Sequence, residues 1–141
     1  MKNIVFLAFF ILTTLCQQAF AQCNADALCS TCIPKLTAPG FNFLKPYKIN
    51  GGRDLTKVEY SYVFTKGTQY MIAICDQNSK ENTIVITIYD AQRNKVATNK
   101  VESNLLSAIA YPCNATGIYY MQYTFESSSS RCGGSVLGFK K

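Results

Sequence analysis

The sequence predicts an all-β protein, an antiparallel and jelly-roll-like β-sandwich of seven to eight strands. Three observations lead to this prediction. The chain of 141 residues has nine Tyr and nine Phe, and aromatic and β-branched residues favour strands. From Phe41 onward, short runs alternate between apolar and polar side chains with a period of two. Turn residues separate these runs at the spacing of a sandwich, and no run has a convincing helical period.

The clearest run is Val58 to Phe64, where every second side chain is apolar and the intervening Glu59 and Ser61 are polar. The stretch Asp90 to Asn94 is a turn by composition. Lysines at both ends of the run 95–100 are typical of an edge strand. Ser127 to Ser130 is best explained as a loop, and Arg131 to Gly134 as a turn held by a disulfide. The remaining strands are predicted over Gln69–Cys75, Thr83–Tyr89, Lys95–Lys100, Leu105–Tyr111, Ile118–Phe125 and Val136–Lys140.

The first residues have the pattern of a secretory signal peptide. Lys2 supplies an early positive charge, Ile4 to Leu15 is an apolar run of twelve residues, and Ala19-Phe20-Ala21 is a small-x-small cleavage pattern. Twelve apolar residues are too few for the roughly twenty of a spanning helix. We therefore expect a signal peptide over 1–21, a cysteine-rich segment over 22–39 and a sandwich domain over 40–141. The mature protein is expected in the periplasm, on the cell surface or in the medium, with no transmembrane anchor.

Cleavage would leave an even number of cysteines. In an exported chain these predict up to three disulfides, which would tether the N-terminal segment to the sandwich. A zinc site or a redox pair at Cys29-x-x-Cys32 is the alternative, but there is no second close pair and no histidine to complete a metal site. The sequence does not choose the connectivity. The predicted disulfide cysteines are Cys23, Cys29, Cys32, Cys75, Cys113 and Cys132.

The residue inventory offers little for catalysis. The chain has no histidine, so a serine nucleophile would have only a lysine or a carboxylate as its base. No Gly-rich phosphate loop joins a strand to a helix. We therefore expect a non-enzyme without a cofactor. Asp76, Glu81 and Asp90 are weak candidates for a calcium site, since calcium needs several oxygen ligands; turn residues are the alternative explanation.

Outward-facing side chains are the better candidates for binding. If Ile84, Ile86 and Ile88 point inward, then Tyr89 points outward. The same alternation in the run 118–125 turns Ile118 and Tyr120 outward. Exposed tyrosines occur at protein interfaces and sugar platforms, although cross-strand tyrosine pairs are also ordinary parts of a sheet. The net charge of +6 suits attraction to acidic glycans or proteins, and compartment argues against nucleic acid.

Several motifs resemble the bacterial pre-peptidase C-terminal (PPC-like) domain, a β-sandwich. The resemblance covers about residues 55–126. It rests on Tyr60-x-Tyr62-x-Phe64-x-Lys66-Gly67-Thr68-x-Tyr70, on the hairpin 82–99 and on Gly117-Ile118-Tyr119-Tyr120. Acidic residues often precede the central strand of that family, and Asn82 stands there in this chain, which weakens an inherited calcium site. The export signal also resembles that of small envelope proteins of Bacteroidota-type bacteria.

Three functions are consistent with these observations. The first is an exported interaction module, an accessory subunit of a cell-envelope or extracellular protein assembly, because the chain is short and has no catalytic constellation. The second is a carbohydrate-binding module that uses Tyr89 and Tyr120. The third, which the residue inventory favours least, is a small secreted enzyme or inhibitor.

Overall fold

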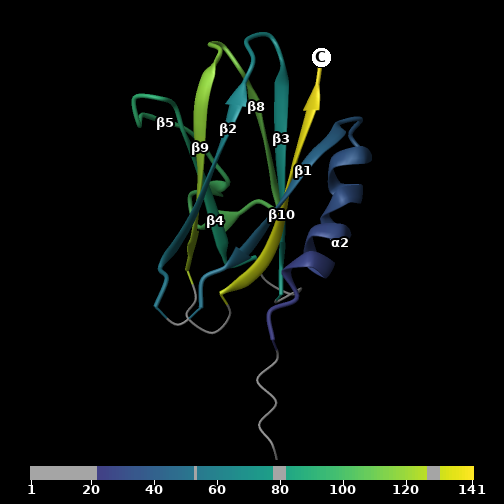
Figure 1. Ribbon diagram of the computed structural model, residues 1–141, viewed down its shortest axis with the longest axis vertical. Coiled ribbons are helices and arrows are strands. Elements are labelled where there is room, and N and C mark those ends of the chain that lie inside the picture. Colours follow the sequence, from purple (N-terminus) through teal and green to yellow (C-terminus); the bar gives the residue numbers. More distant parts are fainter. Residues whose placement is uncertain (1–21, 53, 78–81, 127–130) are drawn as a thin grey trace, which may run out of the picture.

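A computed structural model describes residues 22–52, 54–77, 82–126 and 131–141, and shows a β-sandwich with one helix on its outside (Figure 1). The predicted signal peptide and Ser127 to Ser130 lie outside the described residues. The elements are α2 (Ala25–Thr37), β1 (Asn42–Asn50), β2 (Lys57–Phe64), β3 (Gln69–Asp76), β4 (Ile84–Tyr89), β5 (Lys95–Thr98), β6 (Lys100–Val101), β7 (Asn104–Leu105), β8 (Ala108–Pro112), β9 (Gly117–Phe125) and β10 (Cys132–Lys140).

Eight of these strands form two four-stranded antiparallel sheets. Sheet A has the order β1-β10-β3-β8 and sheet B the order β2-β9-β4-β5, while β6 and β7 form a separate small hairpin. Successive strands alternate between the two sheets except at β4 and β5, and this connectivity is that of a jelly roll. The predicted antiparallel, jelly-roll-like sandwich is therefore confirmed.

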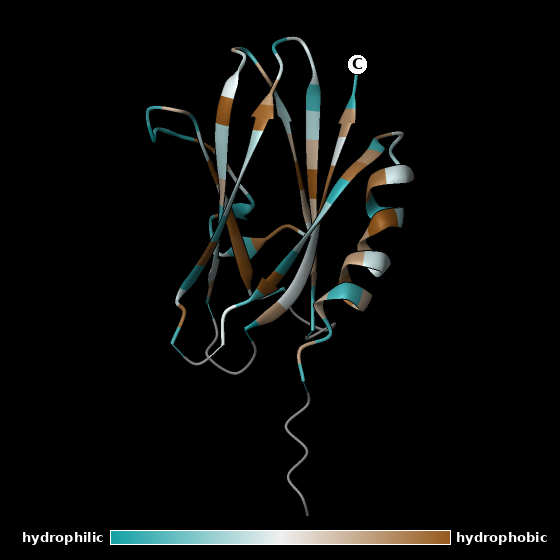
Figure 2. Ribbon diagram, viewed as in Figure 1, coloured by the Kyte–Doolittle hydropathy of each residue, from teal (hydrophilic) through white to brown (hydrophobic). Residues whose placement is uncertain are grey.

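The sandwich core lies between the two sheets. The alternation predicted for β4 is confirmed, because Ile84, Ile86 and Ile88 are fully buried. The rings of Phe64 and Tyr70 stack at 3.9 Å between centroids, which joins sheet B to sheet A. Figure 2 shows hydrophobic residues along the strands and a hydrophilic turn between β4 and β5. The core residues include Tyr47, Ile49, Ile72, Ile74, Tyr119, Met121, Tyr123 and Leu137.

Helix α2 contradicts the expectation that no helix follows the signal peptide. Its N-terminus is capped by Asn24, whose side-chain oxygen accepts a hydrogen bond from the Ala27 amide at 3.1 Å. Asp26 in the first turn and Lys35 in the last turn complement the helix dipole. The buried face consists of Ala25, Cys29, Cys32 and Leu36, a helical spacing that was overlooked because two of its four members are cysteines assigned to disulfides.

A second apolar cluster fills the space between α2 and the outer face of sheet A. The helix lies against β10, β3 and β1, and Figure 1 shows it along that side of the sandwich. Because this layer covers the middle of sheet A, its two central strands, β10 and β3, are buried on both faces. The cluster is formed by Cys29, Cys32, Leu36, Phe41, Ala73, Cys75 and Val136.

Most predicted strands are found, with four differences. The run Lys95–Lys100 is divided between β5 and β6, which belong to different sheets. Strand β1 was not assigned, because Pro46 and a β-bulge between Phe43 and Lys45 break its alternation. The run Leu105–Tyr111 is divided between β7 and β8. The predicted turn at 131–134 is largely wrong, since β10 begins at Cys132.

The glycines that suggested this turn serve close packing instead. A Cβ on Gly133 would lie 2.3 Å from Ile84 Cδ1, and one on Gly134 would lie 2.3 Å from the Cys29 backbone nitrogen. At Gly134 the neighbouring atoms are backbone, so only glycine allows β10 to lie so near α2. At Gly133 a larger residue would require the Ile84 side chain to move. Within the part of the chain that the structure describes, no helix is long and apolar enough to cross a membrane.

Candidate functional site

Four of the predicted disulfide cysteines are paired. Cys23 is joined to Cys132 and Cys32 to Cys75, with Cα atoms 5.5 and 5.7 Å apart. The first bond ties Cys23, two residues before α2, to the start of β10, and the second ties the middle of α2 to β3. The tethering of the N-terminal segment to the sandwich is therefore confirmed.

The prediction of a third disulfide is wrong for Cys29 and Cys113, which are buried free thiols. Cys29 lies on the buried face of α2, where its Sγ is 3.3 Å from the carbonyl oxygen of Tyr47 on β1. Cys113 lies in the sandwich core, 3.8 Å from the hydroxyl of Tyr119. The two thiols thus belong to different layers of the fold and do not meet.

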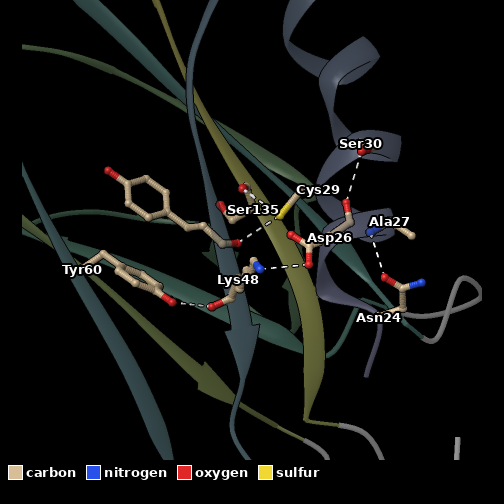
Figure 3. A network of polar contacts seen from close by, with 9 residues as sticks. Asn24, Asp26, Ala27, Cys29, Ser30, Lys48, Tyr60 and Ser135 are labelled. Carbon is tan, nitrogen blue, oxygen red and sulfur yellow. Dashed lines mark hydrogen bonds and ion pairs between the residues drawn. The ribbon is translucent and has the colours of Figure 1, made fainter. Parts of the chain in front are cut away.

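The surroundings of Cys29 suit a structural thiol (Figure 3). Its Sγ also lies 3.6 Å from the carbonyl oxygen of Ser135. Near Cys29, Lys48 forms an ion pair with Asp26 at 2.9 Å, and the hydroxyl of Tyr60 donates to the Lys48 carbonyl at 2.5 Å. Burial raises the pKa of the Cys29 thiol. It therefore stays protonated and unreactive, which argues against the redox interpretation of Cys29-x-x-Cys32.

The predicted binding residues meet on the outer face of sheet B, which α2 does not cover. Tyr89 of β4 is directly opposite Tyr120 of β9, and both are half-buried. Ile118 of β9 is 46% exposed and lies opposite Val63 of β2, which is 56% exposed. Among the large exposed hydrophobic residues that the structure describes, Val63 and Ile118 are paired in register. We call Val63, Ile118, Tyr120 and Tyr89 the tyrosine face.

One ring of this face is already occupied. The guanidinium carbon of Arg93 lies 3.6 Å from the centroid of the Tyr120 ring, a cation–π geometry. Arg93 also binds Glu59 Oε2 at 2.9 Å, and Gln122 donates to the same oxygen at 3.2 Å. The hydrogen bond from Arg93 lowers the pKa of Glu59, and the carboxylate in turn raises the pKa of Arg93. The position of Arg93 over the ring leaves Tyr120 poorly placed for stacking on a sugar.

A pocket of about 260 Å³ opens beside Ile118. Its walls come from the β4–β5 turn at Asp90 to Gln92 and from the loop at Asn114 to Gly117. This volume is below the roughly 300–1,000 Å³ of pockets for drug-sized ligands. A side chain of a partner could enter it.

The structure does not bring the calcium candidates together. Asp76 is the last residue of β3 and accepts hydrogen bonds from the amide and hydroxyl of Thr83, just before β4, at 2.8 and 2.6 Å. Asp90 lies at the other end of β4, where it accepts from the amides of Gln92 and Asn94. Glu81 lies outside the described residues. Asp76 and Asp90 therefore have turn and loop roles, which the sequence interpretation had named as the alternative.

A larger pocket of about 490 Å³ lies between α2 and the end of β3. The Lys35 ammonium in its wall donates to the carbonyl of Ile74 at 3.0 Å, and the Asp76 carboxylate is held by Thr83. The charged side chains of this pocket are therefore engaged in holding α2 and the β3–β4 connection. Within the described ranges, no group of three or more Cys, Asp or Glu side chains has the geometry of a metal site.

Sequence reasoning missed Val63 and Arg93. Val63 follows from the alternation already recognised in β2, because it shares a face with Glu59 and Ser61. No pattern in the sequence indicated Arg93. It lies in a turn with a positive φ of 66°, and only the folded chain places this turn over Tyr120.

No protein-family model matches the sequence, and no curated protein matches it. Among solved structures, the chain is similar to PliG of Aeromonas hydrophila, a periplasmic inhibitor of g-type lysozyme. The TM-score is 0.49, with 12% identity over 72% of this chain and 90% of that chain. It is also similar to the pre-peptidase C-terminal domain of a Bacillus anthracis collagenase, with a TM-score of 0.47 and 13% identity over 68% and 86% of the chains.

A Streptococcus agalactiae complex of the glycosylation-associated protein Gap123 gives a TM-score of 0.38 and 12% identity, over 72% of this chain and 39% of that chain. At these identities the likeness concerns the fold alone. The resemblance to the pre-peptidase C-terminal domain thus has a weak structural counterpart. The similarity to Bacteroidota envelope proteins gains no support from these structures and stays a prediction.

Proposed function

We propose that this chain is an exported, non-catalytic interaction module that binds another protein through the tyrosine face. The observation that carries the proposal is the pair Val63 and Ile118, two exposed aliphatic side chains opposite each other on adjacent strands. Aliphatic and aromatic side chains gathered on one sheet face are typical of the buried centre of an interface. Such a module would act as an accessory subunit of an envelope or extracellular assembly.

The covering of sheet A supports this choice of face. Sheet A has α2 and two disulfides on its outer side, and the outer face of sheet B has no comparable layer in the described chain. Disulfides are typical of exported proteins, so the partner is expected outside the cytoplasm. The net charge of +6 and Lys66 beyond the end of β2 favour a partner that is apolar at its centre and acidic around it.

The pocket beside Ile118 gives this surface an anchor point. Binding energy at protein interfaces concentrates in a few side chains that fill pockets near the centre of the contact. Because Ile118 belongs both to the pocket and to the tyrosine face, one partner side chain in the pocket would lie next to Val63 and Ile118. Glycan binding, the second candidate, has less support because Arg93 occupies the Tyr120 ring.

Site-specific photocrosslinking tests the proposal. A photoreactive phenylalanine replaces Ser61, which is exposed on β2 beside Val63, in cells that produce the protein. The matched control carries the same group in place of Ser30 on the exposed side of α2. We expect one protein adduct from position 61, its loss when Ile118→Lys is added, and no adduct from position 30.

The melting temperature decides whether Ile118→Lys is a fair test, and an unchanged value is expected because Ile118 is exposed. Equal adducts from both positions, or adducts that survive Ile118→Lys in a folded protein, contradict the proposal. A glycan array tests the carbohydrate-binding alternative. If the protein binds a glycan and the double variant Tyr89→Ala with Tyr120→Ala does not, that alternative replaces the proposed function.

A further inference from the structure

We infer that the free edge of β2 accepts an extended, acidic segment of the protein partner as an additional strand of sheet B. This inference rests on the proposed function and specifies how the partner is held. Strand addition joins two proteins through main-chain hydrogen bonds, with side chains giving specificity. The sandwich has four sheet edges, formed by β1, β8, β5 and β2.

Three of the four edge strands carry features that prevent further pairing. β1 has a bulge between Phe43 and Lys45 and contains Pro46. β8 has five residues and ends at Pro112. β5 has four residues and a register shift opposite Tyr89. Short strands, proline and bulges are the usual means by which proteins protect a sheet edge from new partners.

β2 has none of these features. It is eight residues long, contains no proline, and pairs with β9 in unbroken register from Lys57 to Phe64. Among the residues that the structure describes, its single strand neighbour in sheet B is β9. Along an antiparallel edge strand, alternate residues direct their N–H and C=O groups away from the neighbour. The outer side of β2 therefore offers a regular row of main-chain donors and acceptors.

This edge is held in place by the other sheet. The Tyr60 hydroxyl donates to the Lys48 carbonyl of β1, and the Tyr47 and Tyr60 rings lie 4.8 Å apart. A strand fixed in this way loses little conformational freedom when a partner adds to it. Val63 is the last outward-facing residue of β2, so an added strand would lie directly beside the tyrosine face.

The charges along the edge indicate the chemistry of the added strand. Glu59, the acid of β2, is bound by Arg93 and Gln122. Lys57 begins the strand and Lys66 follows it, and both side chains are exposed. The charge that remains for a partner is thus positive. A second copy of this chain would bring the same lysines and a net charge of +6, so we assign the edge to an acidic segment of another protein.

A displayed library of random 12-residue peptides, selected on the folded protein, provides the probe. We expect the enriched peptides to alternate apolar β-branched residues with polar ones and to carry acids near their ends. Hydrogen exchange with the tightest peptide bound should slow alternate amides of β2 at least tenfold, with no change in β5. No enrichment, or binding that leaves the β2 amides unprotected, overturns the inference.

Charge variants add a second measurement. Lys57→Glu together with Lys66→Glu should lower the affinity for the selected peptide at least tenfold without changing the melting temperature of the protein. Lys95→Glu on β5, the other edge of the same sheet, is the matched control and should leave affinity within twofold. Equal losses from both sets would mean that overall charge alone holds the peptide, which contradicts pairing at β2.

Photocrosslinking at position 61 and peptide binding at β2 distinguish a failure of the proposed function from a failure of strand addition. If position 61 gives its adduct but no peptide protects β2, the tyrosine face remains the docking surface and strand addition is wrong. If peptides protect β2 but position 61 gives no adduct in cells, the β2 edge can bind an added strand but the proposed function is wrong.

Discussion

Sheets A and B have four strands each, yet their outer faces differ. The outer face of sheet A lies under α2, with Cys32, Leu36 and Val136 buried between them. Sheet B has Val63 and Ile118 exposed on its outer face and one ring, Tyr120, under Arg93. The outer face of sheet A is therefore closed by covalent bonds and apolar packing, whereas the outer face of sheet B is left open apart from the contacts of Arg93 with Glu59 and Tyr120. Stability is thus concentrated on the side of sheet A, and the outer face of sheet B remains for a partner.

The largest effect is expected from opening the closed layer. Replacing Cys32 and Cys75 by alanine removes a bond across a sequence separation of 43, which the chain-entropy relation values at about 4 kcal/mol. The free energy of unfolding in urea should fall by about that amount. Cys29→Ala, which leaves both disulfides intact, is the control and should cost about 1 kcal/mol. A similar loss in both variants would mean that packing under α2 outweighs the covalent bond.

A pair of glycine substitutions compares the two sheets directly. In Gly134→Val the new side chain would collide with the Cys29 backbone of α2, and such overpacking costs about 1–3 kcal/mol. In sheet B, a Cβ on Gly117 meets nothing within 4 Å, so Gly117→Ala should be neutral or slightly stabilising. Thermal melts of both variants measure this difference. Equal destabilisation would show that α2 is not rigidly held against β10.

The interior between the sheets should unfold in alkali. Burial raises the pKa of Tyr47 from 10.0 to about 12, and burial likewise raises the pKa of Tyr119 and Tyr123. The unfolded chain loses these protons first, so the contribution of Tyr47 is fully present below pH 10 and is lost as pH rises toward 12. Phenolate absorbance and circular dichroism should change together. Tyr47→Phe should move the loss of structure to higher pH.

The smallest effect belongs to the outer face of sheet B. Glu59→Gln removes the ion pair with Arg93, and exposed pairs contribute little. Because the hydrogen bond from Arg93 lowers the pKa of Glu59 from 4.5, the stabilisation by this carboxylate is present above pH 4.5 and disappears as pH falls through the lowered value. The melting temperatures of the two proteins should therefore differ slightly at pH 7 and converge in acid. A difference that persists in acid would contradict the assignment.

The sandwich was predictable because its strands alternate regularly. β2, β4 and β9 each have one buried face, whereas β3 is a mostly apolar run that is buried on both faces. The predicted bounds of these four strands differ from the structure by one residue at most at each end. β1 and α2 were not predicted, for physical reasons. A bulge and Pro46 interrupt the alternation of β1, and the buried face of α2 contains cysteines, whose role in disulfides concealed their helical spacing.

The candidate site was predictable only in part. Alternation turned Ile118, Tyr120 and Tyr89 outward, and register then placed Tyr89 opposite Tyr120. The contact of Arg93 with Tyr120 depends on the path of a turn with positive φ, which no periodicity encodes. The state of Cys29 and Cys113 was equally hidden, because pairing depends on distances between layers and an even cysteine count does not supply them.

The position of β10 has a consequence for how the protein is made. β10 is the last strand in sequence but lies between β1 and β3, and β9 likewise separates β2 from β4. A chain that crosses a membrane from its N-terminus would have neither sheet assembled until residues 117–140 emerge. The disulfide of Cys23 could not form until Cys132, 109 residues further along, had emerged. Until then α2 would lack β10, the central strand of the surface against which it packs. Synthesis interrupted before β10 should therefore leave an unfolded chain for proteases, with no half-folded sandwich.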